Sequence, residues 1–153
     1  MHPRLNMFKA APDAVQPVIE LKNYIHGSGL EHRFIHLINL RASQINGCAY
    51  CVDMHVKESR QDGLSEQWIN LMSVWWESPV YDEKERALLG WVDAVTKVAE
   101  TGIPDSAFEP LKKFFSDKEI VTLSVAIGMI NIWNRLAVGF RSQHPVDKPA
   151  IAA

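Results

Sequence analysis

The stretch LRASQINGCAYCVDMH, residues 40–55, determines how this chain is expected to fold. An apolar pattern of helical period runs from about Glu31 to Ile45 and stops at Asn46-Gly47, a pair that commonly breaks helices. A second helical segment begins near Cys48 and continues to Asp62-Gly63. A break this short leaves the two helices side by side, so we predict a helical hairpin.

Outside this hairpin, apolar residues also recur with helical period, and no segment alternates with the period of two expected for a strand. Ser65, Asp82 with Glu85, and Ser116 with Glu119 are typical helix starts. We therefore predict a single all-α domain over residues 1–153, with a tail from His144 that is frayed. Its seven helices are expected at about residues 12–26, 31–45, 48–62, 65–77, 82–100, 105–114 and 116–141.

Composition excludes several classes of protein. The net charge of −2 and the absence of a Lys/Arg cluster argue against a nucleic-acid partner. The first residues lack the basic and then apolar order of a secretory signal. Ile120 to Trp133, the longest nearly uncharged stretch, is shorter than the roughly 20 residues of a membrane span. A cytoplasmic protein with no membrane partner is therefore expected.

The chain has two cysteines, Cys48 and Cys51. A disulfide across so short a loop would constrain the unfolded chain little, so redox or metal chemistry is a better reason for the pair. With His55 they occupy positions i, i+3 and i+7, which lie on one helical face. A helix N-terminus stabilises a thiolate, and His55 is close enough to accept the proton of Cys51.

This spacing also permits an internal disulfide, which completes a redox cycle. Two other interpretations remain open from the residues. Both cysteines can be inert core residues. Alternatively, Cys48, Cys51 and His55 can bind a structural zinc ion with His36 as the fourth ligand, in a zinc-stabilised oligomer.

Residues 40–55 closely resemble the core motif of the alkylhydroperoxidase D (AhpD)-like proteins, which belong to the carboxymuconolactone decarboxylase superfamily. Residues 123–137 are also similar to the long C-terminal helix of that group. The resemblance implies an AhpD-like helical fold, a homo-oligomer (trimer or hexamer), and antioxidant peroxide reduction without a cofactor or metal. The decarboxylase branch typically lacks the cysteine pair, so that activity is not expected.

The resemblance also implies roles for individual residues. Cys51 would be the activated thiol, Cys48 its disulfide partner and His55 the proton relay. The family often has a glutamate twelve residues before the first cysteine, where this chain has His36. His36 is therefore predicted to lie near His55 and to leave it without a carboxylate partner, so that His36→Glu would raise activity.

Expected partners are an organic hydroperoxide or hydrogen peroxide and a thiol reductant such as a lipoylated or thioredoxin-like protein. The alternative within the same chemistry is a dithiol carrier for such a partner, without peroxidase activity.

Overall fold

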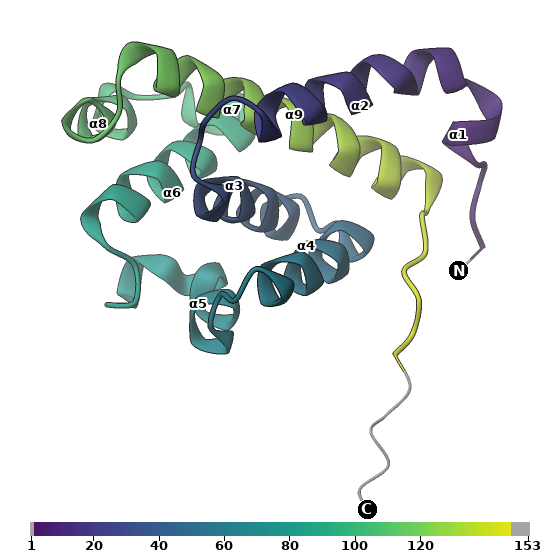
Figure 1. Ribbon diagram of the computed structural model, residues 1–153, viewed down its shortest axis with the longest axis horizontal. Helices are drawn as coiled ribbons and strands as arrows, with labels where there is room; N and C mark the ends of the chain where they lie inside the picture. The colour runs from purple at the N-terminus through teal and green to yellow at the C-terminus, as the bar shows by residue number, and fades with distance from the viewer. Residues whose placement is uncertain (1, 148–153) are drawn as a thin grey trace, which may run out of the picture.

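The computed structural model describes residues 2–147, and this part of the chain contains helices and no strand (Figure 1). The α-helices are α1 (Met7–Ala10), α2 (Pro12–His26), α3 (His32–Ile45), α4 (Ala49–Gln61), α5 (Glu66–Leu71), α6 (Glu83–Thr96), α7 (Val98–Thr101), α8 (Asp105–Phe108) and α9 (Asp117–Phe140). Two 3-10 helices, η1 (Met72–Glu77) and η2 (Glu109–Lys113), follow α5 and α8. The all-α prediction is confirmed.

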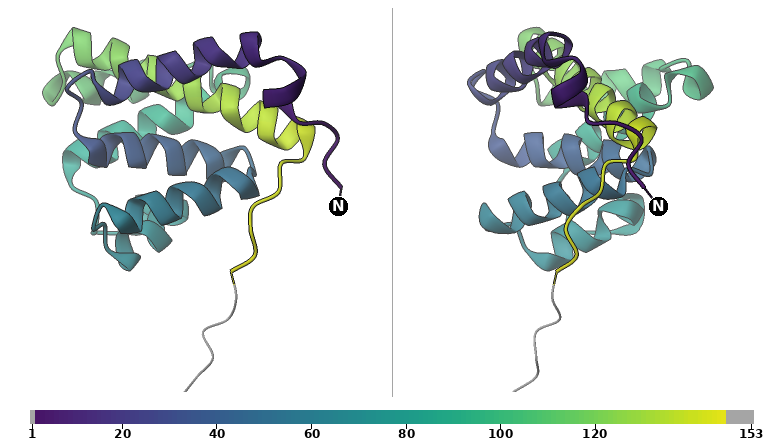
Figure 2. Two further views of the ribbon diagram at one scale, coloured as in Figure 1. Left: turned by 45° about the vertical axis from the view of Figure 1, so that its right-hand side comes forward. Right: turned by 90° about the vertical axis from the view of Figure 1, so that its right-hand side faces the viewer.

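Helix α3 lies at the centre of the molecule, with α4 on one side and α9 and α2 on the other (Figures 1 and 2). Every residue from Phe34 to Ser43 is buried, because α4, α6 and α9 cover different faces of the helix. The charged Arg41 is tolerated there because its Nε and Nη2 donate to the two carboxylate oxygens of Asp93 on α6, at 2.6 and 2.8 Å. A bidentate pair of this kind compensates for the lost hydration.

The predicted helix starts are confirmed. Ser65 caps α5, and full capping boxes are present at Asp82 with Glu85 and at Ser116 with Glu119. Three predicted helices are each divided in the structure. The helix predicted at residues 82–100 separates into α6 and α7 at Lys97, which has non-helical angles. Val74 has non-helical angles in the segment after α5, and the chain tightens to η2 after α8. The short α1, capped by Asn6, has no buried residue and therefore no apolar periodicity to reveal it.

Helix α9 has 24 residues and extends beyond the apolar stretch seen in the sequence at both ends. By length and composition it is apolar enough to cross a membrane, the one such helix in residues 2–147, and half of its most apolar window is buried within the protein. It packs against α2, α3, α4 and α6. Of the tail predicted to be frayed, residues 144–147 are non-helical, and those after 147 lie outside the described residues.

Candidate redox site

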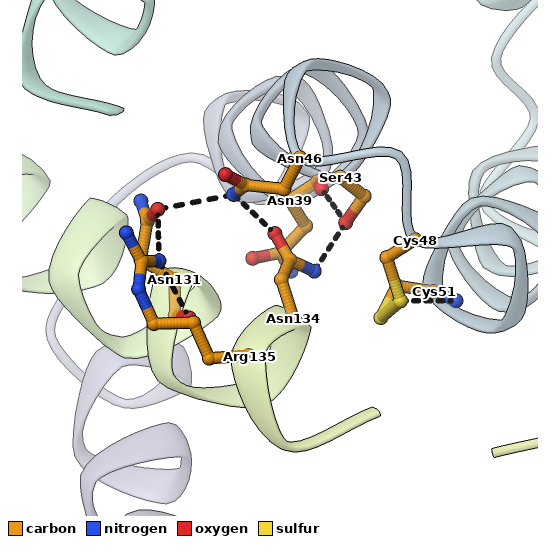
Figure 3. Close-up of a disulfide and its surroundings, with 8 residues drawn as sticks. All are labelled: Asn39, Ser43, Asn46, Cys48, Cys51, Asn131, Asn134 and Arg135. Carbon is orange, nitrogen blue, oxygen red and sulfur yellow. Dashed lines mark hydrogen bonds between the residues drawn. A yellow bond between two sulfur atoms is a disulfide. The ribbon is translucent and has the colours of Figure 1, made fainter. Parts of the chain in front are cut away.

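The turn between α3 and α4 places both cysteines. Gly47 adopts a φ of +64°, in the left-handed region that favours glycine, and the next amide, that of Cys48, donates to the carbonyl of Ser43 at 3.0 Å. Cys48 is the N-cap of α4, and its Sγ accepts a hydrogen bond from the amide of Cys51 at 3.3 Å. The two cysteines form a disulfide, 1% and 2% exposed respectively (Figure 3). The pair therefore sits at a helix N-terminus, as predicted.

A network of amide side chains holds this turn against α9 (Figure 3). The Asn46 amide donates to the side-chain oxygens of Asn131, at 3.0 Å, and Asn134, at 2.8 Å. The Asn134 amide in turn donates to the hydroxyl of Ser43 at 3.0 Å. Asn134 is 1% exposed, so these hydrogen bonds replace the ones that its amide would make with water. Ala137, one turn further along α9, packs beside the two cysteines.

His55 is buried one turn after Cys51 and forms a close pair with Glu58. Its Nδ1 lies 2.7 Å from Oε2 of Glu58, while its Nε2 is buried without a hydrogen-bond partner in the described structure. The hydrogen bond from His55 holds the pKa of Glu58 below its ordinary value, against the effect of partial burial. An ionised carboxylate behind Nδ1 stabilises an imidazolium and leaves Nε2 to exchange protons.

Cys51 and His55 line a cavity of about 580 Å³, the size of a site for a small organic molecule. Cys48 is not part of its wall, so Cys51 is the sulfur that faces the cavity. Most of the remaining wall is apolar and comes from α1, α2, α4 and α9: Phe8, Ile19, Met54, Met129, Ile130 and Trp133.

The N-terminal segment closes one side of this cavity. Arg4 donates from its backbone amide to the carbonyl of Phe140 at 2.9 Å and from Nη1 to that of Gly139 at 3.0 Å. The ring of Phe8 stacks on Trp133 with centroids 6.4 Å apart. These contacts tie residues at the start of the chain to the end of α9, over the site.

The structure places His36 in a second, smaller cavity of about 240 Å³. Its Nε2 lies 2.7 Å from Oδ2 of Asp62, just after the end of α4, and no hydrogen bond joins it to His55. Glu58 lines this second cavity while it bonds to His55 of the first, and the proximity of His36 helps to lower the pKa of Glu58. The expectation that His55 lacks a carboxylate partner is wrong, because Glu58 provides one from one turn along the same helix.

Sequence reasoning missed Glu58 and Asn134 as parts of this site. The signal for Glu58 is its spacing of i+3 from His55, which extends the motif to Cys-x-x-Cys-x-x-x-His-x-x-Glu. Asn134 is one of several polar residues on an apolar helix, a pattern that indicates buried hydrogen bonds without naming the partner. Within residues 2–147, no group of three or more His, Cys, Asp and Glu side chains is placed to hold a metal ion.

Comparison with known proteins identifies the family of this chain. Residues 12–94, more than half of the chain, match the model of the carboxymuconolactone decarboxylase family. The crystal structure of ATU0492 from Agrobacterium tumefaciens, a protein of unknown function proposed to be the antioxidant defence protein AhpD, is 74% identical with a TM-score of 0.94. The match covers 95% of this chain and 100% of that one.

Two further proteins are similar at lower sequence identity. Protein YdfG of Bacillus subtilis is 30% identical over 90% of this chain and 94% of its own length. The crystal structure of the debrominase Bmp8 superposes with a TM-score of 0.78 at 20% identity, over 86% of this chain and 71% of that one. The cysteine pair at a helix start, the all-helical fold and these matches lead to one conclusion: the chain is an AhpD-like member of the carboxymuconolactone decarboxylase family.

Proposed function

We propose that this protein is a thiol-dependent peroxidase that reduces organic hydroperoxides, with Cys51 as the attacking thiol. One observation carries the proposal: Cys51 and His55 line the same apolar cavity, and Glu58 holds His55 through Nδ1. Nε2 of His55 has no hydrogen-bond partner among residues 2–147. A nucleophile, an oriented base and room for an organic molecule are the parts that such a reaction requires.

In the reduced protein, Nε2 of His55 takes the proton of the Cys51 thiol, and Glu58 stabilises the imidazolium that forms. The α4 N-terminus favours the resulting thiolate. The thiolate attacks the terminal oxygen of the hydroperoxide, so that an S–O bond forms as the O–O bond breaks. The leaving alkoxide takes the proton from His55, which gives an alcohol and a sulfenic acid on Cys51.

Cys48 then attacks the sulfur of this sulfenic acid. The S–S bond forms, and the hydroxide that leaves takes up the Cys48 proton as water. The disulfide of the structure is the product of this step. Two thiols of a donor restore the pair by exchange, and an external thiolate that enters the cavity meets Cys51. A lipoylated or thioredoxin-like protein has the required dithiol.

His36 contributes to this proposal from the second cavity. It lies close enough to Glu58 to favour its ionised form, and it pairs with Asp62. His36 is thus proposed to support the relay through Glu58 and not to touch the substrate. We further propose that the protein is a cytoplasmic homo-oligomer, a trimer or a hexamer.

The test is peroxide consumption by the reduced protein, followed by thiol titration and mass spectrometry. One equivalent of cumene hydroperoxide should remove two thiols and leave one intramolecular disulfide. Cys51→Ser should abolish consumption, while Cys48→Ser should accumulate a sulfenic acid that a dimedone reagent traps. A dithiol carrier without peroxidase activity would instead exchange with dihydrolipoamide while its thiols persist in excess peroxide.

A further inference from the structure

The cavity beside Cys51 has a cationic group that the peroxidase chemistry does not use. Lys22, on α2, lines the cavity and is half-buried. No Asp or Glu is among the described residues of the wall, and Lys22 makes no ion pair within residues 2–147. A partly desolvated ammonium without a counterion favours an anion in its surroundings.

The carboxylate nearest in effect to Lys22 already has another partner, so Lys22 is available to an anionic ligand. The charge of Lys22 acts on Glu58 of α4 and on His26 of its own helix, and it lowers the pKa of both side chains. Glu58, however, is hydrogen-bonded to His55. The amides of Asn23 and Asn39 also line the cavity and add polar groups to a wall that is otherwise largely apolar.

From this arrangement we infer that the cavity selects amphipathic anions, that is, hydroperoxides with an apolar chain and a carboxylate. The carboxylate pairs with Lys22, the chain lies against Ile19, Met129 and Trp133, and the peroxide reaches Cys51. A fatty-acid hydroperoxide is the simplest molecule of this class. The reaction is unchanged: the hydroperoxide becomes the hydroxy acid as the two thiols become a disulfide. This assignment rests on the proposed function for its chemistry, but the binding preference stands independently of turnover.

Binding is therefore measured first, on the disulfide form, where no turnover occurs. Calorimetry compares decanoate with decan-1-ol, which have the same chain and differ in charge. The wild-type protein should bind decanoate about tenfold more tightly, since one charge-assisted hydrogen bond is worth about that factor. Lys22→Met should remove this preference, and Lys118→Met, at an exposed position outside the cavity, should keep it. Equal binding of the two ligands by the wild type, or the same loss in both variants, would overturn the inference.

Kinetics then separate this inference from the proposed function. Linoleic acid hydroperoxide and its methyl ester are compared as substrates of the reduced protein. Lys22→Met should raise KM for the acid about tenfold and leave KM for the ester unchanged. Loss of the Lys22 charge can also change the pKa of Glu58. That effect would alter the rates of both substrates, whereas loss of carboxylate binding would affect the acid alone. If neither peroxide is consumed but decanoate is still preferred through Lys22, the proposed function fails and the binding site stands. If Lys22→Met consumes the acid and the ester with the same KM values as the wild type, the inference fails and the peroxidase stands.

Discussion

Nδ1 of His55 and Oε2 of Glu58 lie 2.7 Å apart, one turn from each other on α4. The proposed relay therefore lies within a single helix, which carries Cys51, His55 and Glu58 in successive turns. A helix keeps such spacings fixed, so the rest of the fold has only to bury the pair and supply a cavity.

Glu58→Gln should slow the reaction of Cys51. The amide cannot stabilise an imidazolium as the carboxylate does, and the expected loss is about tenfold, part of the 10² to 10⁴ that a positioned base contributes. The measurement is the pH dependence of alkylation of the reduced protein by iodoacetamide, in which the variant should need a higher pH. Glu66→Gln, which removes an exposed partner of Arg60, is the control. Identical profiles for the wild type and Glu58→Gln would show that Glu58 does not act on the thiol.

The same pair predicts a pH dependence of stability. The pKa of Glu58 is lowered in the folded protein, so its ionised form stabilises the fold above the ordinary value of 4.5. This contribution is lost as the pH falls through the lower, folded pKa. Because Glu58 is partly exposed, we expect no more than about 1 kcal/mol. Urea unfolding of wild type and Glu58→Gln should differ at pH 7, and the difference should shrink as the pH falls below 4.5. A constant difference would contradict this origin.

His36→Glu should not increase the rate, contrary to the expectation from sequence. His55 already has a carboxylate partner, and a glutamate at position 36 would face Asp62 and the nearby Glu58 with the same charge. The measurement is the rate of peroxide consumption together with thermal unfolding, with His36→Gln as the uncharged control. A rate gain of about tenfold in His36→Glu, without a gain in His36→Gln, would show that a carboxylate at position 36 does assist His55.

Asn134→Ala should destabilise the protein by about 2–3 kcal/mol, because Ser43 and Asn46 lose buried hydrogen-bond partners. Since Asn46 belongs to the turn before Cys48, the reduction potential of the pair should also shift, and redox titration measures that shift. Gln16→Ala, at an exposed pair with Glu20, should change stability by less than about 0.5 kcal/mol. A similarly small change in Asn134→Ala would show that water replaces the amide.

The proposed oligomer has a candidate interface on α9. Val121, Val125, Gly128 and Ile132 are exposed at spacings of four, three and four, which places them in one stripe. Val125→Glu with Ile132→Glu should convert the oligomer to a monomer near 17 kDa in light scattering. Val98→Glu, at an exposed position on α7, should leave the mass unchanged. A wild-type monomer at micromolar concentration would refute the oligomer.

The sequence by itself determined what lies within one or two turns of helix. The helix class, the caps at Ser65, Asp82 and Ser116, and the cysteine pair at a helix start all follow from local spacing and capping chemistry. Such features depend on neighbours at i+3 and i+4, which a sequence displays directly. The prediction that Cys48 and Cys51 are paired is confirmed, and it too depends on an i, i+3 spacing.

Only the tertiary structure decided which distant residues meet. His36 and His55 belong to the two arms of one hairpin, yet His36 pairs with Asp62 while His55 pairs with Glu58. Nothing in the spacing of Lys22 or Phe8 indicates that they share a wall with Cys51. The rotation of α3, α2 and α9 about their axes is set by the packing of whole helix faces. A shift of one of these helices by one turn against its neighbours would give these side chains different partners. The local spacing and capping signals in the sequence would remain the same.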